Sequence, residues 1–295
     1  MLATQRKVYS LPMSPSVPER PQASAPALIS VRGVSLWLGR PGHRRLALDG
    51  IDLDCGRRSI TGLVGPSGSG KSTLLKTIGG LLRPDKGEVL IDGMPASEAV
   101  KKNRFGMVFQ QPILLPWRNV QDNVCFTAEL VHATRASGSA ARKARLERAN
   151  ELLELVGLSD HLHKYPRELS GGMQQRVSIA RALMTEPDIL LMDEPFSALD
   201  EVIRERLNLT LLNIWERTKV TIVFVTHSLS EAAFLTDDIY ILGADPGRVV
   251  DHVKVPLHRP RTLETFRLPE FTELTMYLRE VLGNVSDERQ RTLES

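Results

Sequence analysis

The chain has 295 residues, of which 42% are hydrophobic and 25% are charged, and 38 lysine and arginine residues stand against 35 aspartate and glutamate residues. This composition excludes a wholly disordered chain, a collagen-like fibre and a coiled-coil rod. No apolar run approaches the roughly 18 residues that a membrane-spanning helix requires, and the first residues lack the apolar core of a signal peptide. We therefore expect a protein that stays in the cytosol and does not cross a membrane by itself.

Cysteines and basic clusters exclude two further classes of protein. Cys55 and Cys125 are too few and too far apart for a disulfide scaffold or a zinc cluster, so we expect two packed free thiols. The basic clusters at residues 101–104 and 142–148 are short and contain no aromatic residue. A solvated helix face explains these clusters better than contacts to phosphates do, and we expect no nucleic-acid partner.

The predicted elements follow a tail of residues 1–28, whose five prolines stand among serine, alanine and glutamine and predict disorder. Apolar segments typical of strands come next at residues 28–38, 46–53, 59–64, 88–93, 104–110, 188–193, 219–226 and 237–242. Helical patterns occupy residues 71–82, most of residues 117–185 and the intervals between the later strands. Continuous apolar strands that alternate with helices predict an α/β fold with a mainly parallel, buried sheet.

A glycine-rich segment, GPSGSGKS at residues 65–72, fits the phosphate-loop pattern G-x-x-x-x-G-K-[ST] between a strand and a helical pattern. Its glycines let backbone N–H groups point inward around phosphates, and the N-terminus of the following helix adds partial positive charge. Lys71 is predicted to reach the outer phosphates, and the Ser72 hydroxyl is predicted to ligate Mg²⁺. The predicted nucleotide-binding residues are Gly65, Pro66, Ser67, Gly68, Ser69, Gly70, Lys71, Ser72 and Thr73.

Two carboxylates end the apolar strand ILLMDE at residues 189–194. Asp193 is predicted to hold Mg²⁺, and Glu194 is placed to polarise a water for attack on the γ-phosphate. Alone, these residues would as readily be two acidic groups that cap a loop before Pro195. Beside a phosphate loop, the catalytic interpretation is favoured because the carboxyl ends of buried strands face the ligand in α/β sheets.

The octapeptide LSGGMQQR at residues 169–176 lies between the phosphate loop and these carboxylates. In this position it resembles the signature of ABC-type ATPases, and the chain from about residue 29 to 255 is similar to that family in the order of its motifs. The resemblance implies a P-loop NTPase core with a mainly parallel sheet, an antiparallel β subdomain and a helical signature subdomain at about residues 112–180. It also implies hydrolysis of Mg-bound ATP and a helical extension, residues 256–295, packed on the domain.

The family resemblance implies roles for the remaining motifs. Gln110 corresponds to the glutamine that senses Mg²⁺ and the attacking water, and His227 corresponds to the switch histidine that contacts the γ-phosphate. Asp200, in SALD, is implied to act across a dimer interface. A second anion site precedes a helix and consists of Ser170, Gly171 and Gly172. The resemblance implies that this site binds the ATP held by a second copy of the chain.

Two positions depart from the family pattern. Ser228 stands where relatives usually have aspartate, which changes a local cap and leaves the chemistry of His227 intact. The family stacks adenine on an aromatic residue of an early loop, whereas here Leu38 takes the usual place and Trp37 comes one residue early. Because a shift of one residue reverses the face of a strand, Trp37 is either an adenine platform or an ordinary packing residue.

Two later segments, residues 111–124 and HRPRTLETF at residues 258–266, resemble importers of the nitrate, sulfonate and taurine group. The resemblance implies a peripheral subunit on the cytoplasmic face of a bacterial inner membrane that energises uptake of a small anion or organosulfur solute. Its implied partners are a second ATPase subunit, permease subunits and, indirectly, a periplasmic solute-binding protein. The apolar residues of the first segment either fill the core or line a groove for a permease helix: Leu114, Leu115, Trp117 and Val120.

Other functions are compatible with parts of this pattern. A non-transport ABC ATPase that acts on DNA or ribosomes usually contains coiled-coil insertions or paired cassettes, which the sequence lacks. A small-molecule kinase shares the phosphate loop but has no reason to carry SGGMQQR. An ABC ATPase that serves a different solute stays possible, because no substrate contact is expected on this chain.

Overall fold

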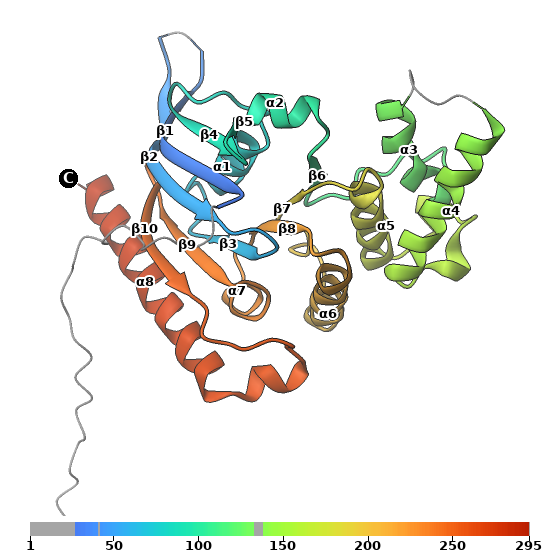
Figure 1. Cartoon of the computed structure of the whole chain (residues 1–295). Helices are drawn as coiled ribbons and strands as arrows, with labels where there is room; N and C mark the ends of the chain where they lie inside the picture. The colour runs from blue at the N-terminus through green and yellow to red at the C-terminus, as the bar shows by residue number, and fades with distance from the viewer. Residues whose placement is uncertain (1–26, 41, 133–137, 295) are drawn as a thin grey trace, which may run out of the picture.

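The structure is a computed structural model that describes residues 27–40, 42–132 and 138–294. Among these residues, the larger of two sheets has six strands in the order β10-β9-β3-β8-β7-β6, in which only β10 runs antiparallel to its neighbour (Figure 1). The strands are β3 (Ile60–Val64), β6 (Phe105–Val108), β7 (Ile189–Asp193), β8 (Thr221–Val225), β9 (Asp238–Gly243) and β10 (Arg248–Lys254). The phosphate loop therefore follows an inner strand, β3, at the carboxyl ends of the parallel strands.

The smaller sheet is antiparallel and, within the described residues, has four strands in the order β2-β1-β4-β5. It meets the larger sheet where Leu48 pairs with Gly247. The strands are β1 (Ile29–Leu38), β2 (Arg45–Cys55), β4 (Lys86–Ile91) and β5 (Met94–Pro95). This sheet brings β2 beside the helix that follows the phosphate loop, because α1 (Lys71–Ile78) contacts β2, β7 and β8.

Helices surround the larger sheet and also form a separate lobe beyond β6 (Figure 1). The lobe consists of α3 (Val120–His132), α4 (Ser139–Leu155) and α5 (Gly171–Leu183), and α5 connects it to β6. The other helices are α2 (Ala96–Lys101), α6 (Glu201–Thr218), α7 (Leu229–Leu235) and α8 (Pro269–Glu294). Short 3₁₀ turns are η1 (Ser159–His161), η2 (Pro166–Glu168) and η3 (Leu263–Arg267).

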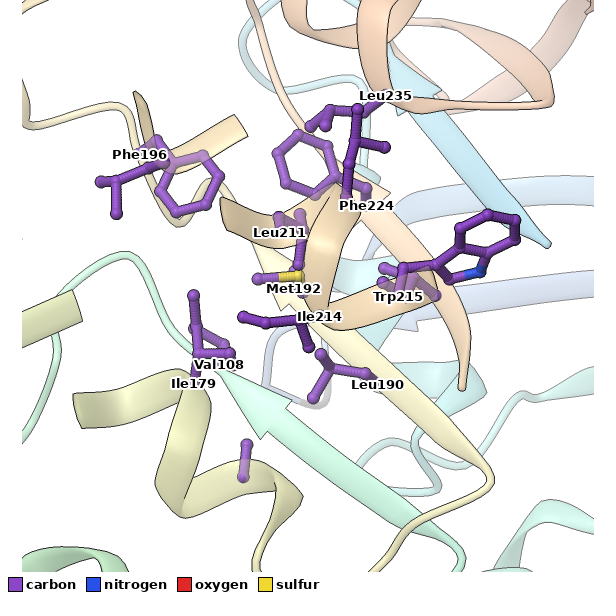
Figure 2. Packing of buried hydrophobic residues seen from close by; sticks show 14 of the residues in the cluster. Val108, Ile179, Leu190, Met192, Phe196, Leu211, Ile214, Trp215, Phe224 and Leu235 are labelled. Carbon is purple, nitrogen blue, oxygen red and sulfur yellow. The ribbon is translucent and has the colours of Figure 1, made fainter. Parts of the chain in front are cut away.

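The inner strands of the larger sheet are buried on both faces because their alternate residues enter two different cores. Leu190, Met192 and Phe224 pack with residues of α5 and α6 in one core, which Figure 2 shows. Leu191 and Val223 enter the other core, which includes α1 and the smaller sheet. Burial on both faces explains why these strands are continuous apolar runs in the sequence.

The segment between β10 and α8 forms hydrogen bonds to the backbone at the end of α7. Arg261, which is 5% exposed, donates hydrogen bonds to the carbonyl oxygens of Phe234 at 2.9 Å and Thr236 at 2.7 Å. Arg259 donates to the carbonyl oxygen of Leu235 at 2.8 Å. Burial lowers the pKa of Arg261 to about 10. The guanidinium groups thus satisfy carbonyls that the end of a helix leaves without intrahelical partners.

The predicted fold class is confirmed. The predicted and observed elements differ at the ends of helices and strands and in a few elements that were not predicted. The helix expected at residues 71–82 ends at Ile78, because Gly79 and Gly80 follow it and glycine disfavours helix continuation. The strands expected at residues 104–110 and 219–226 end at Val108 and Val225, so Gln110 and His227 lie two residues beyond them. The sequence did not predict α2, β5 or β10, which are short or, in β10, mostly polar and solvent-facing.

Two expectations from composition can be compared with the structure. Cys55 and Cys125 are both free and buried, as predicted. None of the helices in the described residues is long and apolar enough to span a bilayer. The predicted tail, residues 1–28, lies almost wholly outside the described residues. The proposed division between residues 29–255 and 256–295 stays a prediction.

Candidate active site

The phosphate loop leaves β3 at Gly65 and ends at the first turn of α1. Gly68 and Gly70 have φ angles of 83° and 85°, in the left-handed region that favours glycine. A Cβ on Gly70 would also lie 2.7 Å from the Leu48 side chain. The loop is thereby curled against β2, and the N-terminus of α1 faces the space above it. A pocket of about 250 Å³ occupies that space and is lined by Arg45, Ala47, Ser67, Gly68, Gly70, Lys71, Ser72, Thr73 and Glu194.

Lys71 is buried and folds over its own loop. Its Nζ donates hydrogen bonds to the carbonyl oxygens of Gly65 at 2.9 Å and Pro66 at 3.0 Å. Burial lowers the pKa of Lys71, and the nearby carboxylates of Glu194 and Asp193 oppose that change. An anion above the loop provides stronger partners than neutral carbonyls do, so the ammonium group is available to phosphates.

Two oxygen ligands suited to Mg²⁺ lie together at this loop. The Ser72 hydroxyl donates a hydrogen bond of 2.7 Å to Oδ1 of Asp193, the last residue of β7. Mg²⁺ prefers oxygen ligands and usually combines one or two protein groups with water and substrate phosphates. The pair therefore fits the predicted cation by its chemistry and place.

Glu194 has an unusual backbone held by several contacts. Its φ is 46°, a left-handed value that is uncommon for a residue other than glycine. Its N–H donates to the carbonyl oxygen of Val225 at 3.0 Å, and its own carbonyl accepts from the Ser197 hydroxyl at 3.0 Å. Its Oε2 lies 3.1 Å from Nδ1 of His227. Strained backbone of this kind persists where the surrounding structure fixes it, and it is concentrated at functional sites.

Gln110 lies beyond the end of β6 and faces the segment after β7. Its Nε2 donates a hydrogen bond of 3.0 Å to the Ser197 hydroxyl. The hydrogen bonds given above therefore connect Gln110, Ser197 and Glu194 in one chain. The side-chain amide of Gln110 is not bonded to Asp193 among the described contacts. The structure thus joins Gln110 through Ser197 to the backbone of Glu194 and leaves its role toward Mg²⁺ a prediction.

The signature residues and Asp200 lie at helix starts. Ser170 caps α5, where its hydroxyl accepts from the N–H of Met173 at 3.3 Å, and Asp200 caps α6, where it accepts from Ile203 at 2.9 Å. A Cβ on Gly172 would lie 2.8 Å from the Ile203 side chain, so the glycine is needed for close packing of α5 and α6. In the described residues, this group is separate from the residues that line the phosphate-loop pocket.

Trp37 is not brought to the pocket. It pairs with Leu46 on β2, whereas the pocket residue Arg45 pairs with Leu38. Because successive strand residues point to opposite faces, Trp37 lies on the face opposite Arg45. Its ring centroid lies 5.5 Å from Nζ of Lys86.

Sequence reasoning missed two pocket residues, and the structure shows the local cap at a residue outside the pocket. Arg45 and Ala47, on alternate positions of β2, line the pocket, and only their spacing in a strand could have indicated a shared face. Ser228 caps α7, because its hydroxyl accepts from the N–H of Glu231 at 3.3 Å. Serine therefore performs the capping at this departure from the family pattern.

Comparison with known proteins decides the family. A profile of the ABC transporter family matches residues 48–197. The chain is 43% identical over 253 residues to an uncharacterized ABC transporter ATP-binding protein of Methanocaldococcus jannaschii, which covers 86% of this chain and 89% of that protein. The chain belongs to the ABC transporter family. The predicted identification as an ABC-type ATPase is therefore confirmed.

Relatives with named functions and solved structures agree with this family. The taurine import ATP-binding protein of Rhizobium johnstonii is 42% identical over 86% of this chain and 95% of its own. The aliphatic sulfonates import ATP-binding protein of Bacillus cereus is 39% identical over 81% of this chain and 91% of its own. A dimeric cassette, MJ0796, bound to ADP and Pi, has a TM-score of 0.67, 32% identity, and coverage of 78% of this ABC ATPase and 100% of that chain.

Proposed function

We propose that this ABC ATPase is the ATP-hydrolysing subunit of a bacterial importer for a small anion or organosulfur solute of the taurine and sulfonate type. The relatives named for taurine and aliphatic sulfonate import support the solute class. The single observation that supports hydrolysis best is the 3.1 Å contact between Glu194 and His227 above the phosphate loop. It joins a carboxylate base to an imidazole at the place where a γ-phosphate is expected.

The proposed chemistry is in-line attack of water on the γ-phosphorus, in which a new P–O bond forms as the bond to the bridging oxygen breaks and ADP leaves with that oxygen. The loop amides and Lys71 bind the phosphates, and Glu194 accepts the proton of the attacking water. His227 orients the carboxylate of Glu194 and contacts the γ-phosphate from the other side. Ser72 and Asp193 hold Mg²⁺, which when bound neutralises phosphate charge.

The complete site is proposed to need a second copy of the chain. In the described residues, the signature residues at the start of α5 do not line their own phosphate-loop pocket. The Ser170 hydroxyl and the α5 N-terminus form an anion site that suits the γ-phosphate held by another subunit. A head-to-tail dimer brings this site and Asp200 of one chain to the nucleotide of the other, and the dimeric state of MJ0796 supports the arrangement.

A loop between β6 and α3 is the proposed contact with the permease. Trp117 is 72% exposed and Ile113 is 59% exposed, which is unusual for large apolar side chains. Both Nη atoms of Arg181, on α5, donate to this loop, to the carbonyl oxygens of Pro112 and Ile113 at 2.8 Å. A permease helix seated here, on the cytoplasmic face of the inner membrane, is thereby connected to the signature helix. A periplasmic solute-binding protein would act through the permease.

Glu194→Gln tests the hydrolytic site. The change keeps the size of the side chain and removes its basicity, so turnover should fall by about 10²–10⁴-fold while ATP binding survives. The variant should accumulate as an ATP-bound dimer, visible by size exclusion with Mg-ATP, while phosphate release reports turnover. Glu216→Gln, an exposed change on α6, is the matched control. Turnover of Glu194→Gln within about threefold of wild type would refute the assignment of the base.

Trp117→Glu tests the transport role separately. The full chain, co-expressed with a permease of the taurine and sulfonate group, should co-purify with that membrane protein, and Trp117→Glu should not. The ATPase activity of the isolated variant should equal that of the wild type, because Trp117 is exposed and does not line the phosphate-loop pocket. Co-purification that is unchanged by Trp117→Glu contradicts the proposed docking loop.

A further inference from the structure

An ion pair joins Arg204 of α6, whose side chain is 25% exposed, to Glu231 of α7, whose side chain is buried. Nε of Arg204 and Oε1 of Glu231 are 4.0 Å apart, and the Glu231 side chain is 5% exposed. Neither of these two atoms has a hydrogen-bond partner within the described part of the chain. Burial raises the pKa of Glu231, and the hydrogen bond from Thr226 and the charge of Arg204 oppose that rise.

The other carboxylate oxygen of Glu231 holds the segment that carries His227. Oε2 accepts a hydrogen bond from the Thr226 hydroxyl, and that hydroxyl accepts from the N–H of Ser228 at 2.9 Å. Thr226 and Ser228 are the two neighbours of His227 in the chain. The carboxylate therefore fixes the backbone on both sides of the histidine.

Arg204 holds the segment SALD, residues 197–200, on the opposite side. Its Nη2 donates a hydrogen bond of 2.9 Å to the carbonyl oxygen of Leu199. The same segment includes Ser197, which contacts the Glu194 carbonyl, and Asp200, which caps α6. Arg204 thus lies between the segment proposed to face the partner subunit and the carboxylate that fixes His227.

The pair lies just beyond the length of a direct hydrogen bond. A charge-assisted N–H···O bond has a length of about 2.7–2.9 Å, so a closer approach of about 1 Å would form one between Arg204 and Glu231. A buried donor and acceptor that lack partners are costly, and the bond removes this cost for both. Movement of α6 toward α7 is therefore favoured by the pair itself.

We propose that Arg204 and Glu231 are positioning residues that transmit a displacement of SALD to His227. Contact with the partner subunit moves SALD, the pair closes, and the contact that His227 already makes with Glu194 is held more firmly. Neither residue touches the nucleotide in this scheme, so neither is a catalytic residue. The inference rests on the proposed ATP-hydrolysing dimer and specifies how its two halves communicate.

Arg204→Met in the full chain is the first test. Turnover at saturating Mg-ATP should fall about tenfold, the effect of one charge-assisted hydrogen bond, whereas KM stays within about twofold. Arg206→Met, on the same helix but exposed, is the matched control and should behave as wild type. Glu231→Gln should resemble Arg204→Met, and the double variant should be no slower than the slower single variant. Additive losses, or a turnover within twofold of wild type for Arg204→Met, overturn the proposal.

A spectroscopic measurement separates positioning from a loss of stability. The ring signals of His227, assigned through His227→Gln in protein with labelled histidine, should shift in Arg204→Met and stay unchanged in Arg206→Met. Unchanged His227 signals in Arg204→Met overturn the proposal. Should Arg204→Met fail to fold, Arg204→Lys keeps the charge but cannot bond both neighbours, and the same outcomes apply to it.

Failure of this inference and failure of the proposed function give different results. If Glu194→Gln abolishes turnover but Arg204→Met does not lower it, the hydrolytic site stands and the positioning pair does not. If Glu194→Gln retains turnover, the proposed site itself is wrong, whatever Arg204→Met does.

Discussion

The side-chain amide of Gln175 on α5 donates a hydrogen bond of 3.1 Å to the carbonyl oxygen of Phe109, the residue before Gln110. Gln175 is 2% exposed, so this bond lies in the interior. Because α5 begins at the signature residues and Phe109 precedes Gln110, one buried amide joins the signature helix to the loop that contacts Ser197. A displacement of the helical lobe would therefore act on the residue before Gln110 through a direct bond as well as through packing.

Gln175→Leu should weaken this connection. The change leaves the Phe109 carbonyl without its side-chain partner, which costs about 1–3 kcal/mol of the free energy of unfolding. Turnover should fall more than ATP affinity, because the phosphate loop is unaffected. Denaturant unfolding and steady-state ATPase assays measure the two effects. Gln111→Leu, at an exposed position, is the control, and equal effects of both variants would contradict the connection.

Ser170→Arg should spare ATP binding by one subunit and prevent the ATP-bound dimer. The arginine adds bulk at the α5 N-terminus, where the nucleotide of the partner is proposed to dock. Loss of the cap alone costs about 1 kcal/mol, and Ser170→Ala measures that part separately. Sedimentation with Mg-ATP and a Glu194→Gln background reports the dimer. A dimer of wild-type strength in Ser170→Arg contradicts the proposed head-to-tail arrangement.

Trp37→Ala and Arg45→Ala should affect ATP affinity differently. Arg45 lines the pocket above the phosphate loop, whereas Trp37 lies on the opposite strand face. Removal of an exposed cation from an anion site is expected to weaken ATP binding about two- to fivefold, and Trp37→Ala should change affinity by less than twofold. Equilibrium titration with a fluorescent ATP analogue provides both values. A large loss in Trp37→Ala alone would favour its interpretation as the adenine platform over that as a packing residue.

The two thiols should be unreactive in the folded protein. Burial raises the pKa of Cys55 from its ordinary 9.0 to about 12 and that of Cys125 to about 11. The folded state thus keeps these protons where the unfolded state loses them, so this contribution to stability is complete below pH 9 and declines above it. Ellman's reagent at pH 8 should detect neither thiol until denaturant unfolds the chain. Rapid reaction of either thiol in native buffer contradicts its burial.

The sequence could predict those parts of the site that lie in contiguous motifs. The phosphate loop follows β3 and the two carboxylates follow the apolar run of β7, and local pattern determines both the loop and its place at the sheet edge. The bond between Ser72 and Asp193 fits this arrangement, because β3 and β7 run parallel on either side of β8, end at the same edge of the sheet, and α1, which carries Ser72, contacts β7. The family signature likewise begins a helix, and Ser170, a typical N-cap residue, predicts where that helix starts.

Side-chain geometry between distant segments could not be predicted in this way. The left-handed backbone of Glu194, the turn of Gln110 toward Ser197 and the distance between Arg204 and Glu231 depend on how packed helices settle against the sheet. The face of Trp37 stayed open because a bulge shifts the register between Leu36 and Trp37. Such shifts leave no reliable mark on the pattern of apolar residues.

The hydrogen bonds from Arg259 and Arg261 to the end of α7 affect the order in which parts of the chain can fold during synthesis. A ribosome synthesises β8 and α7 before these arginines. The last carbonyls of α7 therefore lack these hydrogen-bond donors until the later residues emerge. The helix that follows His227 is thus completed only when the chain beyond β10 has left the exit tunnel and folded back. Nascent chains that lack this segment should hold α7 loosely, which delays a competent ATP site until the segment has been made.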